Sequence, residues 1–173
     1  MKKIKLGKLF TVFICSIILN SCINPFAPTI IDSDIDLPIL GDQTTIEGFF
    51  QNFRYAYNLR DTVVYGNLLA DDFTFHYRNY EKNLSLSWSR PEDMLTTYGL
   101  FNAVQNLEFI WNEIVRNEGN EIERVIERGF HLTINFSPTD VVRVYGRVNF
   151  ALKRKNENEN WKLFIWQDES NYF

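Results

Sequence analysis

The stretch from residue 49 to residue 77 constrains the fold most, because its hydrophobic pattern changes there from a helical period to a strand period. Around its start, apolar residues recur at steps of three and four, which predicts a helix over residues 45–59. Aromatic rings dominate one side of that helix, and such a side has to be buried against another layer of structure. Its members are Ile46, Phe49, Phe50, Phe53 and Tyr57.

Asp61 follows this helix and is well placed to accept hydrogen bonds from the free N–H groups of a shorter helix, residues 62–69. We therefore interpret Asp61 as a helix cap rather than a catalytic carboxylate. After residue 72 the period becomes two, as in a strand with one buried face. Phe73, Phe75 and Tyr77 lie on its apolar face, and Thr74 and His76 lie on the opposite face.

The N-terminal residues predict export and lipid attachment. Residues 1–21 combine four lysines, no acid and a short apolar run, which is typical of a secretion signal. The segment Leu-Asn-Ser-Cys at 19–22 resembles the lipobox of bacterial lipoproteins, in which the cysteine becomes a lipidated N-terminus. We expect acyl chains such as palmitate on Cys22 to anchor the protein in the cell envelope, at the outer membrane or periplasmic face. Cys15 would leave with the signal, so neither a disulfide nor a cysteine metal site is expected.

This interpretation divides the chain into a signal (1–21), a tether with three prolines (22–44) and a single domain (45–173). Losing the four lysines of the signal would change the formal charge from −4 to −8. An acidic domain lacks the clustered cations that phosphate neutralisation needs, so nucleic-acid binding is not expected. The basic run at 153–155 is interpreted as the solvated end of a hairpin.

Residues 78–87 are polar and irregular and are interpreted as a loop. Ser89 and Glu92 then have the spacing of a capping box, and Pro91 suits a first helical turn, so a third helix is expected to begin here. Trp88 precedes the cap and is expected to pack on this first turn. The expected buried side of the helix consists of Met94, Leu95, Tyr98 and Phe101.

Alternating patterns predict three further strands, and a run that is apolar on both faces predicts a fourth, so that the four form an antiparallel meander. They cover residues 106–116, 122–136, 142–153 and 161–168, and turn-forming residues separate them. Gly129 interrupts the second of these strands, which favours a β-bulge that bends the sheet at this point. The last strand is apolar on both faces, so we expect both faces to be covered.

Three helices followed by a bent meander predict an α+β fold, with the helices packed on one face of a curved, mostly antiparallel sheet. The order of elements resembles the nuclear-transport-factor-2-like superfamily. This cone-shaped fold includes ketosteroid isomerase, scytalone dehydratase, polyketide-cyclase-like domains and uncharacterised bacterial lipoproteins. The segments that carry the resemblance are residues 57–75, 88–93, 100–101, 161–163 and 166–168.

The resemblance implies a pocket that catalyses proton transfer in some members and binds a ligand or partner in others. Ketosteroid isomerase uses a carboxylate near the end of the first strand, where this chain has Tyr77 after His76, which speaks against isomerase activity. Scytalone dehydratase uses histidines and tyrosines, but His76 and His131 lie on the polar faces of their strands and are expected to point outward. No catalytic residue is therefore assigned, and these two histidines are the remaining candidates. They do not form a metal site, and no cofactor is expected.

The chain contains fifteen Phe, eight Tyr and four Trp, and their rings can either fill the core or line a cavity. The sequence leaves both arrangements open. If a cavity exists, its walls should come from the apolar faces of the elements, and a small apolar or aromatic ligand would suit them. The expected wall residues are Tyr57, Phe75, Tyr77, Phe101, Trp111, Phe130 and Leu132.

Three functional hypotheses follow. The leading one is a membrane-tethered, non-catalytic domain that binds a small apolar ligand or an envelope partner, and it predicts no titratable pair inside the cavity. The second is a lyase or isomerase of the scytalone-dehydratase or polyketide-cyclase type, with His76 or His131 within hydrogen-bond reach of a Tyr or Asp there. The third is a structural module that forms a homodimer through its sheet, and it predicts an exposed apolar patch such as Phe164 with Trp166.

Overall fold

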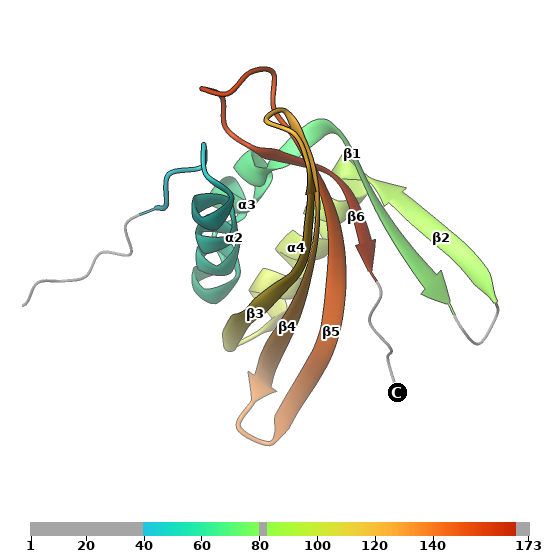
Figure 1. Ribbon diagram of the computed structural model, residues 1–173. Helices are drawn as coiled ribbons and strands as arrows, with labels where there is room; N and C mark the ends of the chain where they lie inside the picture. The colour runs from blue at the N-terminus through green and yellow to red at the C-terminus, as the bar shows by residue number, and fades with distance from the viewer. Residues whose placement is uncertain (1–39, 80–82, 169–173) are drawn as a thin grey trace, which may run out of the picture. The chain divides into compact units, whose positions relative to one another are not determined.

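The computed structural model describes residues 40–79 and 83–168, and Figure 1 shows the helices gathered on one side of a curved sheet. Cys22 and the expected signal lie outside the described residues. The helices are α2 (Ile46–Leu59), α3 (Thr62–Leu68) and α4 (Arg90–Ala103). The strands are β1 (Leu69–Asn79), β2 (Leu84–Ser89), β3 (Asn106–Gly119), β4 (Glu123–Ser137), β5 (Asp140–Lys153) and β6 (Lys162–Asp168). In this part of the chain, no helix is both long and apolar enough to cross a membrane.

The strands form one sheet in the order β2-β1-β6-β5-β4-β3. Neighbouring strands are antiparallel except β1 and β6, which are parallel. The predicted α+β class, with three helices on a mostly antiparallel sheet, is confirmed for the described residues. The loop predicted over residues 78–87 is wrong, because most of it belongs to β1 and β2, which pair with each other. Leu84 and Leu86 of β2 are both exposed, so this strand lacks the buried apolar face that sequence patterns detect.

Local sequence signals fix the starts of the helices, as predicted for Asp61 and Ser89. Thr45 caps α2 by accepting a hydrogen bond from a backbone N–H at 3.0 Å. Asp61 caps α3 and accepts two such bonds, both of 2.9 Å. Ser89 and Glu92 form the predicted capping box at the start of α4. Each cap stabilises its helix by about 1 kcal/mol.

The buried side of α4 differs from the prediction. Leu95 and Tyr98 are 73% and 57% exposed, whereas Asp93, Thr97 and Phe101 are buried. The three buried residues follow one another at steps of four, so they share one face of the helix. That face is therefore more polar than the apolar pattern suggested, and it turns a carboxylate and a hydroxyl towards the sheet.

The pairing of β3 with β4 is irregular opposite Gly129 of β4. Two residues of β3, between Trp111 and Ile114, stand opposite this single glycine, and a second register shift follows at once. A Cβ atom at position 129 would come within 2.9 Å of the Asn112 Nδ2 atom, so that side chain would have to shift. The predicted position of the bulge is confirmed, but the extra residue belongs to β3 rather than to β4.

Aromatic rings fill the core between α2 and the sheet. Phe53 is fully buried, and six ring centroids lie between 4.9 and 5.8 Å from its own. Burial of such a ring typically contributes about 1.5–3 kcal/mol. The six neighbours are Tyr57, Tyr65, Phe109, Trp111, Phe150 and Trp166.

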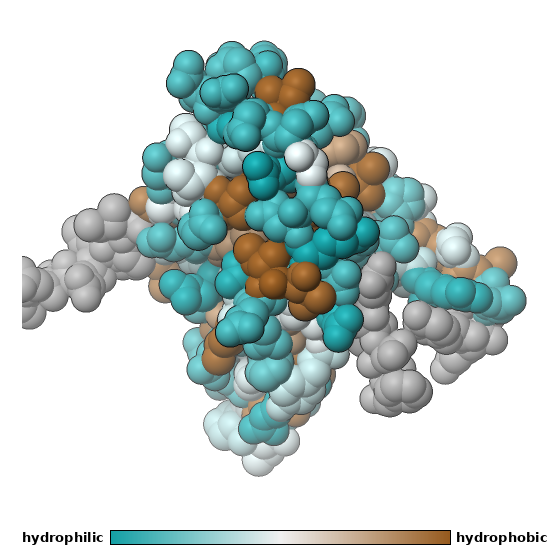
Figure 2. Space-filling view, viewed as in Figure 1, coloured by the Kyte–Doolittle hydropathy of each residue, from teal (hydrophilic) through white to brown (hydrophobic). Residues whose placement is uncertain are grey.

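The last strand contributes to this core, so the predicted exposed patch of Phe164 with Trp166 is wrong. Trp166 is only 9% exposed and packs edge to face on Phe75 and Phe150. Phe164 is half-buried, and the Lys153 ammonium lies 4.8 Å above its ring. On the face seen in Figure 2, hydrophobic residues form small groups within a mainly hydrophilic surface.

The segment before α2, where the tether was expected to end, is hydrogen-bonded to the domain. Gly41 exchanges two hydrogen bonds with the Asn52 side chain of α2, at 2.6 and 3.0 Å. The Gln43 backbone carbonyl accepts a bond of 3.0 Å from Trp161 N–H, and its side chain donates one of 2.8 Å to the Trp161 carbonyl. These bonds fix the chain against the start of β6.

Candidate ligand-binding pocket

A pocket of about 250 Å³ lies between α4 and the inner face of the sheet, and we call it the cone pocket. Every strand contributes to its wall, together with α2 and α4. Most of the side chains are apolar, which is typical of small-molecule sites. The wall consists of Tyr57, Phe75, Trp88, Asp93, Thr96, Thr97, Leu100, Phe109, Phe130, Leu132, Ile134, Val144, Trp166 and Asp168.

The seven residues expected to line a cavity lie in different places. Tyr57, Phe75, Phe130 and Leu132 belong to the wall of the cone pocket. The other three, described next, lie outside that wall.

Trp111 lies in the aromatic core, where its indole N–H donates a 3.0 Å hydrogen bond to the Phe50 carbonyl. Phe101 is buried edge to face against Tyr57, with 5.3 Å between the ring centroids. Tyr77 is half-buried, and its ring lies 5.3 Å from that of Trp88. Residues on the apolar faces of their elements therefore do not all line the cone pocket, and some of them pack elsewhere in the domain.

Asp93 brings a carboxylate to the wall of the cone pocket and is 4% exposed. The Tyr65 hydroxyl donates a hydrogen bond of 2.7 Å to its Oδ2 atom. The indole N–H of Trp88 donates one of 2.9 Å to its Oδ1 atom. Of these two titratable groups, only Asp93 belongs to the wall of the cone pocket. The two bonds join α4 to α3 and β2.

The environment of this pair shifts both titrations upward. Burial raises the pKa of Asp93 above its usual value, although the bonds from Trp88 and Tyr65 act in the opposite direction. Burial also raises the pKa of Tyr65 well above its usual value, and the charges of Tyr57 and Asp93 add to the effect. Tyr65 therefore keeps its proton at neutral pH and acts as the hydrogen-bond donor to Asp93.

Two further polar groups belong to the wall through β6. Asp168 ends the strand and is buried. The indole N–H of Trp166 is buried and has no acceptor among the described residues. Buried donors normally have a partner, so this N–H is an unusual feature of an otherwise apolar wall.

Both histidines are exposed and lie outside the cone pocket. The His76 ring is 3.1 Å from the Thr74 hydroxyl on the same strand. The His131 ring packs against Tyr145 on β5, with 4.7 Å between centroids. The dehydratase hypothesis requires a histidine within hydrogen-bond reach of a Tyr or Asp inside the cavity, and neither histidine meets this condition. Within the described ranges, no group of three or more His, Cys, Asp or Glu side chains could hold a metal ion.

The sequence interpretation missed Asp93 for a physical reason. An acid in the first turn of a helix is common, because it interacts favourably with the helix N-terminus. Next to the capping box of Ser89 and Glu92, Asp93 was therefore an ordinary residue of a helix start and gave no sign of a role in a site. The available signal was its spacing of four with Thr97 and of eight with Phe101. This spacing places the carboxylate on the buried face.

Comparisons with known proteins give a match in structure only. No family model matches the sequence. No curated protein matches it either. A protein from Novosphingobium aromaticivorans, provisionally named a scytalone dehydratase, has a TM-score of 0.62 and 13% identity, over 73% of this chain and 82% of its own.

Two further solved structures agree. A provisionally named dehydratase of the nuclear-transport-factor-2-like family from Streptomyces avermitilis has a TM-score of 0.58 and 12% identity, over 72% of this chain and 93% of its own. A nuclear-transport-factor-2-like protein of unknown function in nutrient uptake from Rhodospirillum rubrum has a TM-score of 0.59 and 16% identity, over 74% and 99%. The fold is therefore nuclear-transport-factor-2-like. Identities this low carry no activity over to this chain.

Proposed function

We propose that this protein binds a small, largely apolar molecule in the cone pocket. The observation that carries the proposal is an open pocket with a wall of aromatic and aliphatic side chains, beside a packed aromatic core. Burial of an apolar ligand there would contribute about 25 cal/mol for each Å² of apolar surface removed from water. A volume of about 250 Å³ suits a molecule with one or two rings.

The hydrogen bonds of Asp93 favour binding over proton transfer. A general base needs a carboxylate oxygen that can reach the proton of a substrate. Each oxygen of Asp93 already accepts a hydrogen bond from a neighbouring side chain. We infer that Asp93 positions the wall and that apolar contacts supply most of the affinity.

A neutral aromatic dye, N-phenyl-1-naphthylamine, tests the proposal. Its fluorescence should rise and saturate as the dye is added to the protein. Leu132→Trp places a larger side chain in the pocket and should abolish the saturable rise. Leu95→Trp makes the same change at a residue of α4 that is 73% exposed, so it should leave the rise unchanged. Equal binding by the two variants would contradict the proposal.

We also propose that Cys22 is lipidated and holds the domain at the cell envelope. The support is the sequence of residues 1–22, which lie outside the described residues. Growth with an alkyne-labelled palmitate should label the full chain and place it in the membrane fraction. Cys22→Ser should lose both the label and the membrane association. A labelled Cys22→Ser variant would show that this cysteine is not the attachment site.

A homodimer formed through the sheet remains a further proposal. Ile110, His131 and Tyr145 pair across β3, β4 and β5 and form a row on the outer face. Ile110 is 47% and Tyr145 60% exposed, so the row offers an apolar surface to a second copy. Sedimentation should then show a dimer that Tyr145→Glu dissociates. A monomer at high concentration would contradict it.

A further inference from the structure

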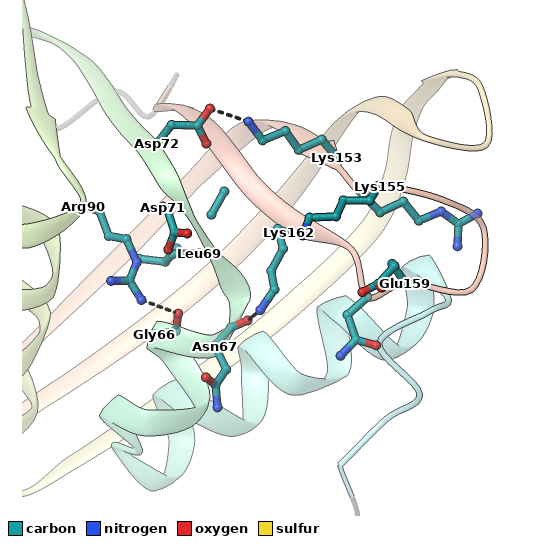
Figure 3. A pocket seen from close by; sticks show the side chains of 13 residues that line it. Gly66, Asn67, Leu69, Asp71, Asp72, Arg90, Lys153, Lys155, Glu159 and Lys162 are labelled. Carbon is teal, nitrogen blue, oxygen red and sulfur yellow. Dashed lines mark hydrogen bonds and ion pairs between the residues drawn. The ribbon is translucent and has the colours of Figure 1, made fainter.

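The second pocket lies at the opposite end of β6 from the cone pocket and has a volume of about 590 Å³. We call it the basic pocket, and its wall includes Asn67, Asp72, Arg90, Lys153 and Lys162. Its wall has five basic and three acidic residues, so it carries a positive balance in an acidic protein. Figure 3 shows Arg90 and Lys162 directed towards the end of α3, and Lys153 directed towards Asp72. The run at 153–155 is thus part of a pocket wall and not only a solvated hairpin end.

Two of the five cations already have structural partners. Lys153 forms an ion pair with Asp72 across β5 and β1. Arg154 stacks on the Trp161 ring at 4.4 Å and donates hydrogen bonds to the carbonyls of Thr44 and Glu157. These contacts fasten neighbouring segments, so neither side chain is needed to explain ligand binding.

Arg90 and Lys162 are held differently, by two consecutive carbonyls at the end of α3. Arg90 Nη2 donates a hydrogen bond of 3.0 Å to the Gly66 carbonyl, and Lys162 Nζ donates one to the Asn67 carbonyl (Figure 3). A guanidinium has five N–H donors and an ammonium has three. The Nε–H of Arg90 is buried and has no acceptor in the described part of the chain.

The charges of Arg90 and Lys162 are not balanced by an ion pair. Neither side chain pairs with a carboxylate of residues 40–79 or 83–168. Burial lowers the pKa of Lys162, and the charge of Arg90 lowers it further, while Asp71 has the opposite effect. Two partly buried cations that repel each other in one cavity favour an anion placed between them.

We infer that the basic pocket binds a small oxyanion, a carboxylate or phosphate monoester group, between Arg90 and Lys162. The guanidinium offers parallel N–H donors, and the ammonium supplies a second charge. Asp71 and Glu159 on the same wall repel further negative charge, so a ligand with one anionic group fits better than a polyanion. The inference does not depend on the apolar ligand proposed for the cone pocket.

Nuclear magnetic resonance of the nitrogen-15-labelled protein tests the site directly. Inorganic phosphate or acetate is added at constant ionic strength while the Nε–H signal of Arg90 is followed. The expected result is a shift that saturates with at least one of the two anions. Saturation with phosphate alone points to a phosphate group, and saturation with acetate points to a carboxylate. No saturable shift with either anion overturns the inference.

Two matched variants separate a site from general charge attraction. Lys162→Gln removes one cation of the site and should weaken binding about tenfold, the loss expected for one charged hydrogen bond. Arg143→Gln removes the same charge at an exposed position of β5 and should leave the titration unchanged. Equal weakening by the two variants overturns the inference. A native-like amide spectrum verifies that Lys162→Gln is folded. The titration of the wild-type protein tests the inference even if this variant does not fold.

Discussion

The cone pocket and the basic pocket both draw on α4, β1 and β6, but their charged groups are partnered in opposite ways. In the cone pocket, both oxygens of Asp93 accept hydrogen bonds from buried or half-buried side chains. In the basic pocket, Arg90 and Lys162 donate to backbone carbonyls, and neither forms an ion pair with a carboxylate of the described residues. A charged group whose hydrogen bonds are made by neighbouring side chains stabilises the pocket wall. A cation without an ion-pair partner can instead bind an anionic ligand.

The largest expected effect distinguishes these two roles at Asp93. Asp93→Leu leaves the Tyr65 hydroxyl and the Trp88 N–H without an acceptor, because both donate to the missing carboxylate. The free energy of unfolding should fall by about 2–4 kcal/mol, the cost of two unpaired donors in a largely buried site. Urea unfolding measures this loss.

Asp93→Asn is the control for this loss. An amide of the same shape can still accept from Trp88 and donate to Tyr65, so it should lose less stability than Asp93→Leu. Equal losses of unfolding free energy in the two variants would show that the hydrogen bonds of Asp93 do not stabilise the pocket wall. The contrast with Arg90 and Lys162 would then fail.

The pH dependence of stability should carry opposite signs in the two pockets. Burial raises the pKa of Asp93 above the usual 3.8, so its contribution is full below that pH and is lost as the pH rises through the folded value. The wild type should therefore lose stability relative to Asp93→Asn as the pH is raised from 4 to 8. Unfolding free energies measured across this range test the sign, and a relative gain for the wild type would contradict it.

The smallest expected effect concerns Asp72 in the basic pocket. The hydrogen bond from Lys153 lowers the pKa of Asp72, so its contribution is present above pH 3.8 and is lost as the pH falls through the lower folded value. Because the Asp72 side chain is exposed, Asp72→Asn should cost less than about 1 kcal/mol at pH 7, and salt should reduce the cost further. Urea unfolding measures this cost. A larger loss of unfolding free energy that does not depend on salt would contradict the interpretation of Asp72 and Lys153 as an exposed ion pair.

Much of the fold could be predicted because its signals are local. The caps at Asp61 and Ser89 depend on residues two to three positions away, and the alternation of β3 to β5 is visible along each strand. Strand β2 was missed because both of its leucines are exposed, so the strand has no buried apolar face of its own for a pattern to detect. The parallel contact of β1 with β6 joins distant segments, so no local pattern reports it.

The site could be predicted only in part. The apolar faces of α2 and the strands indicated Tyr57, Phe75, Phe130 and Leu132, all of which line the cone pocket. Asp93 lies in the first turn of a helix, where an acid is common, and Tyr65 meets it from another helix, 28 residues away in the sequence. The cations of the basic pocket likewise come from separate elements. Polar clusters of this kind arise from tertiary contacts between elements, and the pattern within one element does not show which residues of another element they meet.

The methyl signals of the cone pocket provide the most direct test of its role. Carbon-13 methyl spectra are recorded while N-phenyl-1-naphthylamine is added to the protein, with Leu132, Ile134 and Val144 as reporters of the wall. We predict saturable shifts at these three residues and none at Leu95 or Ile110, which are exposed elsewhere. Unchanged wall signals, or shifts of equal size at the exposed residues, would contradict ligand binding in the cone pocket.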